Sequence, residues 1–126
     1  MIPAFVFGNG LSRTDVDMAK CKTFGPVYAC NAVYREFIPD VLVATDRPIA
    51  EAIQLSGYSK DNTFYTRRPI EGHGASVIPQ QWFGYSSGPI ATALAASRHT
   101  VVYLIGFDMG PSQSGKFNNV YADTEF

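Results

Sequence analysis

The chain has 126 residues, of which 46% are hydrophobic and 17% charged, and its formal net charge is −1. This length favours a single domain over residues 1–126 with a hydrophobic core of its own. The near balance of 10 basic and 11 acidic residues excludes the basic excess that is typical of nucleic-acid-binding proteins. The one adjacent basic pair, Arg67-Arg68, is too small for such a patch.

The sequence also disfavours a membrane protein and a zinc protein. No run reaches the roughly 18–20 apolar residues that a membrane-spanning helix needs, and the N-terminus lacks the pattern of a signal peptide. We therefore expect a cytoplasmic protein. The two cysteines, Cys21 and Cys30, form no CxxC motif, so a zinc site is not indicated. We expect Cys30 to be a buried thiol, and a cytosolic location disfavours a disulfide between the two.

Short apolar runs predict the strands of a sheet. The first run, residues 3–7, stops at Gly8-Asn9-Gly10, and the last, residues 101–105, stops at Gly106. Continuous rather than alternating apolar runs are typical of strands that are buried on both faces, as in a parallel sheet. The predicted strands are residues 3–7, 27–30, 41–44, 63–66, 75–78 and 101–105.

A first helix is predicted over residues 47–55. Asp46 precedes it at the position of an N-cap, and Pro48 suits the first turn of a helix. Ile49 and Ile53 are spaced for one apolar face. This helix would follow the third strand directly.

A second helix is predicted over residues 87–98. Ser86 or Ser87 is its expected cap, Pro89 suits its first turn, and its alanines allow close packing on a sheet. Strands that alternate with helices predict an α/β fold. We expect a Rossmann-like three-layer sandwich with a mostly parallel central sheet.

Four of the predicted strands are followed by polar or glycine-bearing groups. In an open parallel sheet, ligands bind beyond the carboxyl ends of the strands, so these groups would converge with the amides that begin the second helix. A strand followed by a small, flexible loop is a recurrent way to hold a phosphate or a nucleotide. The candidate binding residues are Gly8, Asn9, Gly10, Ser12, Asn31, Asp46, Ser86, Ser87, Gly88, Gly106, Phe107 and Asp108.

Each candidate also has a structural interpretation. The glycines can form tight turns, Asn31 and Asp46 can cap helices, and Asp108 can hold a loop. The functional interpretation rests on the whole set. His73 has no partner at metal-ligand spacing, and His99 falls at the end of the second predicted helix, where the helix dipole favours a cation. A structural or exposed role is favoured for both.

The ordered motifs GNGLS, ACN, ATD, YSSG and YLIGFD resemble a bacterial family, the sialyltransferases that use a CMP-activated sugar (glycosyltransferase family 42). That family carries a G-N-G-x-S loop after its first strand and a C-N pair after its second. An S-G helix start and a Y-L-x-G-x-D strand end follow. The resemblance extends from Phe5 to Asp108 and is looser in the middle. It implies metal-independent binding of CMP or a CMP-sugar, with no cofactor required.

The same resemblance implies roles for individual residues. Asn9 and Gly10 would approach the nucleotide phosphate or ribose, and Asn31 would contact the nucleotide sugar. Ser87 and Gly88 would hold the donor through the helix amides. The cytidine pocket would be lined by Gly106, Phe107 and Asp108.

The chain departs from the family pattern in two places. The family tends to have Asn at the position of Asp46, where a carboxylate would repel a donor phosphate. Its catalytic His lies beyond the strand that ends at Asp108, where neither His73 nor His99 falls. The family's phosphate-stabilising tyrosines also follow that strand, and Tyr121 is the one residue of this chain that is a candidate for such a role. We therefore expect a nucleotide-binding core without the catalytic lid and His, and we assign no catalytic base.

Two functions remain open on these grounds. The first is a sialyltransferase-like protein that binds a cytidine nucleotide or nucleotide sugar, with glycosyl transfer as its chemistry. The second is a non-catalytic nucleotide-binding or assembly module on the same fold. The low charge content and the aromatic content of 13% fit a homo-oligomer. Phosphoryl transfer is a weaker alternative, because the chain has no P-loop motif.

Overall fold

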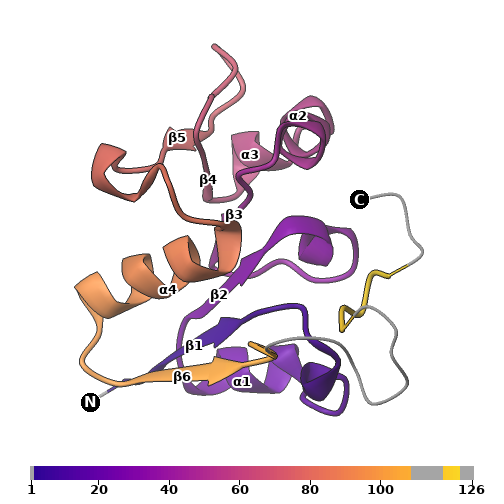
Figure 1. Ribbon diagram of the computed structural model, residues 1–126, viewed down its shortest axis with the longest axis vertical. Coiled ribbons are helices and arrows are strands. Elements are labelled where there is room, and N and C mark those ends of the chain that lie inside the picture. The colour runs from indigo at the N-terminus through magenta and orange to yellow at the C-terminus, as the bar shows by residue number, and fades with distance from the viewer. Residues whose placement is uncertain (1, 109–117, 123–126) are drawn as a thin grey trace.

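The computed structural model describes residues 2–108 and 118–122, which fold around one six-stranded sheet (Figure 1). The strand order is β5-β4-β3-β2-β1-β6, and every pair of neighbours is parallel. This arrangement confirms the predicted α/β class with a parallel central sheet. The strands are β1 (Ala4–Phe7), β2 (Val27–Cys30), β3 (Val41–Val43), β4 (Phe64–Thr66), β5 (Ser76–Val77) and β6 (Val102–Ile105).

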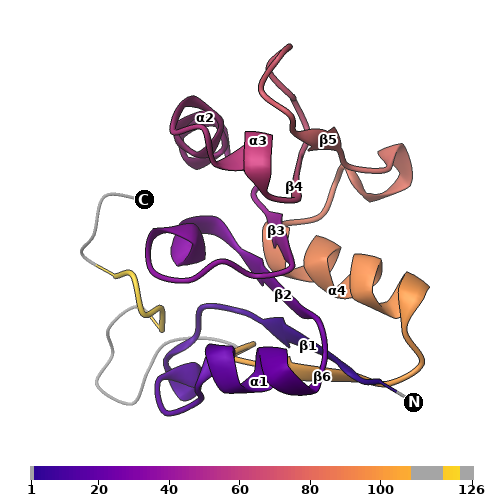
Figure 2. The same cartoon turned by 180° about the vertical axis from the view of Figure 1, so that it is seen from behind.

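Helices cover both faces of the sheet, with α1 and α2 on one side and α4 on the other (Figures 1 and 2). The predicted helices α2 and α4 have the expected bounds. The helices are α1 (Met18–Phe24), α2 (Arg47–Leu55), α3 (Tyr58–Asp61) and α4 (Ser87–Arg98), with short 3-10 turns η1 (Leu11–Arg13), η2 (Asn31–Arg35) and η3 (Gln80–Trp82).

Helix α1 was not predicted, although its ends carry recognisable signals. The side chain of Asp17 caps it by accepting a hydrogen bond of 3.2 Å from the backbone N–H of Lys20. Gly25 occupies the position after its last turn. An Asp at the start and a Gly at the end are typical of helix boundaries, so Asp17 and Gly25 are the residues from which this helix could have been predicted.

Two hydrophobic clusters separate the three layers. Because successive side chains of a strand point to opposite faces, Val6 contributes to the cluster under α4 while Phe7 contributes to the cluster under α1 and α2. Ile53 of α2 packs in the cluster with Phe7, and Leu94 of α4 packs in the cluster with Val6. The sheet is therefore buried on both faces over its central strands.

The expectation of burial on both faces is wrong for β6. Within the part of the chain that the structure describes, this strand lies at the edge of the sheet and pairs only with β1. Tyr103 and Leu104 are each 53% exposed, on opposite faces. The ring of Tyr103 is covered on one side by Phe5, with ring centroids 5.6 Å apart.

The predicted side-chain caps of the two main helices are also wrong. Asp46 and Ser86 occupy the N-cap positions of α2 and α4, but neither side chain makes a capping hydrogen bond. Ser87 is the first residue of α4, and its hydroxyl bonds to neighbouring loops instead. Both helices therefore begin with backbone N–H groups that no side chain of the described residues caps.

The two cysteines are free thiols, so the structure contains no disulfide between them. Cys30 is buried as predicted, and burial raises the pKa of its thiol to about 12. None of the described helices has the length and apolar character needed to cross a membrane.

Candidate functional site

The loops after β1 and β6 lie against each other at the carboxyl ends of the strands. The N–H groups of Gly8 and Gly10 donate to the carbonyls of Ile105 and Gly106, each at 2.8 Å. A Cβ on Gly8 would lie 2.5 Å from the Gly106 oxygen. Because glycine has no Cβ, these residues allow the backbones of the two loops to approach each other closely. The missing Cβ, which had suggested room for a ligand, is used here for a contact within the protein.

Asp108 joins the same two loops. Its carboxylate accepts from the hydroxyl of Ser12 at 2.5 Å and from the N–H of Ser12 at 3.0 Å. The hydrogen bonds from Ser12 lower the pKa of the Asp108 carboxyl below its usual range. A Cβ on Gly10 would lie 2.5 Å from Cγ of Asp108. Asp108 and Ser12 thus hold the loop after β1, as the structural interpretation expected.

Phe107 ties the loop after β6 to the start of α4. A Cβ on Gly88 would lie 2.9 Å from Cε1 of the Phe107 ring. Gly88 therefore lets the aromatic ring pack on the first turn of α4. This contact brings the β6 loop and the helix N-terminus to one place.

Asn9 connects the loop after β1 to β2. Its side-chain amide donates to the carbonyl of Cys30 at 3.1 Å, and Nη2 of Arg13 lies 3.5 Å from its Oδ1. Asn9 is only 7% exposed. Its buried side chain thus holds the loop after β1 in place through contacts with other residues of the protein.

Ser87 connects α4 to two further strand ends. Its hydroxyl donates to Oδ1 of Asn31 at 3.1 Å and accepts from the N–H of Thr45 at 3.0 Å. The two hydroxyls of Thr45 and Ser87 are also 3.1 Å apart. Asn31 adopts the left-handed conformation with φ of 57°, which Asn tolerates better than most residues. Thr45 was not among the candidate residues, although it directly precedes Asp46.

These contacts assemble a common set of loops, which we call the strand-end rim. The backbone N–H groups of Ser87 and Gly88 open onto it, and within the described residues neither has a hydrogen-bond acceptor. A helix N-terminus carries a partial positive charge of about half a unit and favours anions. The strand-end rim comprises Gly8, Asn9, Gly10, Ser12, Asn31, Thr45, Ser87, Gly88, Gly106, Phe107 and Asp108.

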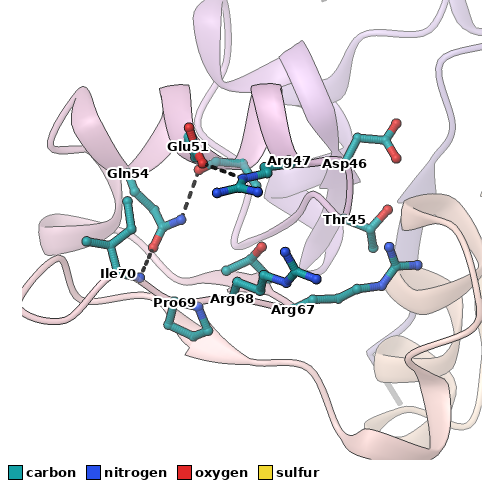
Figure 3. A pocket seen from close by; sticks show the side chains of 11 residues that line it. Thr45, Asp46, Arg47, Glu51, Gln54, Arg67, Arg68, Pro69 and Ile70 are labelled. Carbon is teal, nitrogen blue, oxygen red and sulfur yellow. Dashed lines mark hydrogen bonds and ion pairs between the residues drawn. The ribbon is translucent and has the colours of Figure 1, made fainter.

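Two candidate residues lie outside this network. The side chain of Ser86 is exposed and makes no capping bond. Asp46 is exposed and lines a separate cavity of about 440 Å³ between α2 and the ends of β3 and β4 (Figure 3). The histidines are also elsewhere: His73 contacts the carbonyl of Glu71 in a loop, and His99 bonds the hydroxyl of Tyr28 at the end of α4.

Tyr121 lies on the outer side of the loop after β1. Its hydroxyl donates to Oε1 of Glu36 at 2.7 Å and accepts from Nη2 of Arg13 at 3.1 Å. Burial, followed by the hydrogen bond to Glu36, raises the pKa of the Tyr121 hydroxyl. The next residue back, Val120, donates its N–H to the carbonyl of Asn9 at 2.8 Å. Tyr121 is therefore a protonated donor placed within contact distance of the rim's supports.

Arg13 and Glu36 are site-supporting residues that the sequence analysis missed. Arg13 is 6% exposed, although it carries a charge, and its guanidinium stacks 5.5 Å from the centroid of the Tyr121 ring. Its Nε is buried and has no hydrogen-bond partner among residues 2–108 and 118–122. Neither residue stands in a motif, and they meet only through the fold, so the sequence offered no signal for the pair.

In residues 2–108 and 118–122 no cluster of three or more His, Cys, Asp or Glu side chains could hold a metal ion. A comparison with protein-family models, one with curated proteins and one with solved structures each found no match to this chain. The geometry of the rim and of the neighbouring cavity is therefore what bears on the function of this protein.

Proposed function

We propose that the strand-end rim binds the phosphate of a cytidine nucleotide, as CMP or a CMP-sugar, at the N-terminus of α4. The observation that carries this proposal is the meeting of four strand-end loops around a helix start with two N–H groups free of acceptors in the described chain. Helix N-termini beyond the carboxyl ends of a parallel sheet are a recurrent phosphate site.

The supports of the rim suit such a ligand. Asn31 and Thr45 hold the Ser87 hydroxyl from two sides, so the first turn of α4 is ordered before any ligand arrives. Preorganised donors lose little entropy on binding. The positive end of α4 would offset the charge of the phosphate, the role that a cation fills in other nucleotide sites. The loop from Gly106 to Asp108 would border the cytosine.

The chemistry implied by the sequence resemblance is glycosyl transfer. An acceptor hydroxyl would attack the anomeric carbon of the donor sugar, the bond to the phosphate oxygen would break, and CMP would leave. A general base typically contributes about 10²–10⁴ in rate. We assign no such base, so the proposal covers binding first and transfer second.

Calorimetry with CMP tests the proposal. We expect saturable binding to the wild-type protein and weaker binding to Ser87→Ala, because that variant loses the hydroxyl that orders the helix start. Ser97→Ala is the matched control: its hydroxyl donates to the Leu94 carbonyl in the last turn of the same helix. An absence of heat at millimolar CMP, or equal loss in both variants, would contradict the proposal.

A second function, an assembly module that pairs with another copy of the chain, is favoured by one observation. No described strand pairs with the outer edge of β6, and Val101, Tyr103 and Leu104 are 38%, 53% and 53% exposed there. No charged residue lies between positions 101 and 105, although natural edge strands commonly carry charges that block pairing. Measurement of the molecular mass in solution tests this alternative.

A further inference from the structure

The cavity between α2 and the ends of β3 and β4 adjoins the strand-end rim at Thr45, and it is cationic. Figure 3 shows Arg47 on one side of it and Arg67 and Arg68 on the other. Arg67 and Arg68 follow β4, whereas Arg47 opens α2. The pair that was too small for a patch in the sequence therefore gains a third cation through the fold.

The three arginines differ in how free they are. Nε and Nη2 of Arg67 donate to the carbonyls of Phe83 and Tyr85, each at 2.8 Å. Arg47 is paired with Glu51 at 2.9 Å. Arg68 has no hydrogen bond or ion pair with any described residue. Among the three arginines, Arg68 is thus the one whose guanidinium N–H groups are not used by any described residue.

A buried hydroxyl faces the same space. Thr66 lines the cavity and is only 1% exposed. It lies on the face of β4 that carries Phe64, the face covered by α2. Among the described residues its hydroxyl makes no hydrogen bond, and it is not one of the fully enclosed unpaired atoms, which are Nε of Arg13 and the hydroxyl oxygen of Tyr58. The hydroxyl is therefore accessible from the cavity that Thr66 lines, where it can donate a hydrogen bond to a bound ligand.

The remaining polar lining leaves a positive balance. Gln54 is 1% exposed, but its amide is already used by the Ala50 carbonyl and the Ile70 N–H. Asp46 and Glu51 are the carboxylates of the lining, and Glu51 is bound to Arg47. The lining therefore holds three arginines and two carboxylates, which gives it a net charge of +1. Of the three arginines, only Arg68 pairs with neither a carboxylate nor a backbone carbonyl of the described residues.

We infer that this cavity binds a carboxylate or phosphate group of an acidic substrate, held by Arg68 and Thr66. The inference rests on the proposed function and deepens it. Thr45 lines the cavity and also bonds Ser87 of the rim, so the two sites share a wall. The acidic group belongs either to the sugar of the nucleotide donor or to a separate acceptor that meets the donor at this wall.

Titration of the ¹⁵N-labelled protein with inorganic phosphate tests the inference. We expect the amide signals of Thr66 and Arg68 to shift with saturation. The dissociation constant from these signals should rise about tenfold in Arg68→Gln, which loses a charged hydrogen bond. Thr66→Val, which keeps the shape of the side chain, should also weaken the binding. Lys20→Gln removes an exposed cation of α1 and should leave the constant unchanged.

Parallel titrations distinguish the source of the group. If Arg68→Gln weakens a CMP-linked acidic sugar but not CMP, the donor carries the group. If it weakens only the free acidic sugar, a separate acceptor carries it. The inference is overturned if phosphate leaves Thr66 and Arg68 unshifted, or if Lys20→Gln weakens binding as much as Arg68→Gln. Loss of the proposed function would be seen separately, as an absence of CMP-dependent shifts at Ser87 and Gly88.

Discussion

Ser87 is the residue on which the rim depends most. It is 4% exposed, and its single hydroxyl contacts the loops that follow two different strands through Asn31 and Thr45. Sequence reasoning gave it two roles at the start of its own helix, as a cap of that helix and as a candidate ligand contact. The structure gives it a long-range role, because the acceptor and donor it meets lie more than forty positions away.

Replacement of Ser87 by alanine should therefore lower stability as well as affinity. The buried N–H of Thr45 would lose its acceptor, and an unsatisfied buried donor costs about 1–3 kcal/mol. Chemical denaturation of Ser87→Ala and Ser97→Ala would measure this difference. We expect a clear loss in the first variant and a smaller one in the second. Equal stabilities would show that the Ser87 contacts contribute nothing to the fold.

The contact between Asp108 and Ser12 should depend on pH in a definite direction. Because the folded-state pKa of Asp108 is lowered, the contact is fully present above the ordinary carboxyl pKa of about 3.9. It is lost as the pH falls through the lower, folded-state pKa. An NMR titration of the Asp108 carboxyl carbon should show a midpoint below that ordinary value. A midpoint at or above it would contradict the hydrogen bonds.

At the scale of elements, the strands, α2 and α4 were predictable because continuous apolar runs and proline-led helix starts are local patterns. The exposure of β6 was not predictable. Its five apolar residues indicate a strand, but whether a strand is central or at an edge depends on the order of pairing, which the run itself does not encode. Helix α1 was missed because it has only seven residues and buries only Met18, so it shows no clear apolar face, although Asp17 and Gly25 marked its ends.

The paired loops after β1 and β6 give a prediction at this scale. A methyl group on Gly8 would meet the Gly106 carbonyl, which is backbone and cannot rotate away. Gly8→Ala should cost about 1–3 kcal/mol of stability, as overpacking commonly does. In Gly84→Ala, where nothing lies within 4 Å of the new Cβ, we expect little change. Thermal unfolding of both variants checks this, and an unaffected Gly8→Ala would refute the close approach.

At the scale of the whole molecule, the site could be predicted only in outline. The convergence of strand-end groups followed from the expected parallel sheet, and the structure brings most of them together. The support from Arg13 and Glu36 could not be predicted, because those residues lie in no motif and meet through tertiary packing. The same holds for the cavity, where Arg47 on α2 faces the arginines after β4.

Self-association through the edge of the sheet is a prediction at this largest scale. If two copies pair through β6, Leu104→Lys should shift the mass in solution from dimer to monomer, because it places a charge on the shared edge. The variant should stay folded, since Leu104 is already half-exposed. Light scattering measures the mass. A wild-type monomer at high concentration would exclude this assembly.

The central claim is that a nucleotide phosphate lies at the start of α4. A crystal structure of the protein soaked with CMP tests it most directly. We predict phosphate density within hydrogen-bonding distance of the N–H groups of Ser87 and Gly88, with the base toward the loop that begins at Gly106. CMP bound only in the arginine cavity, or anywhere away from the first turn of α4, would contradict the claim.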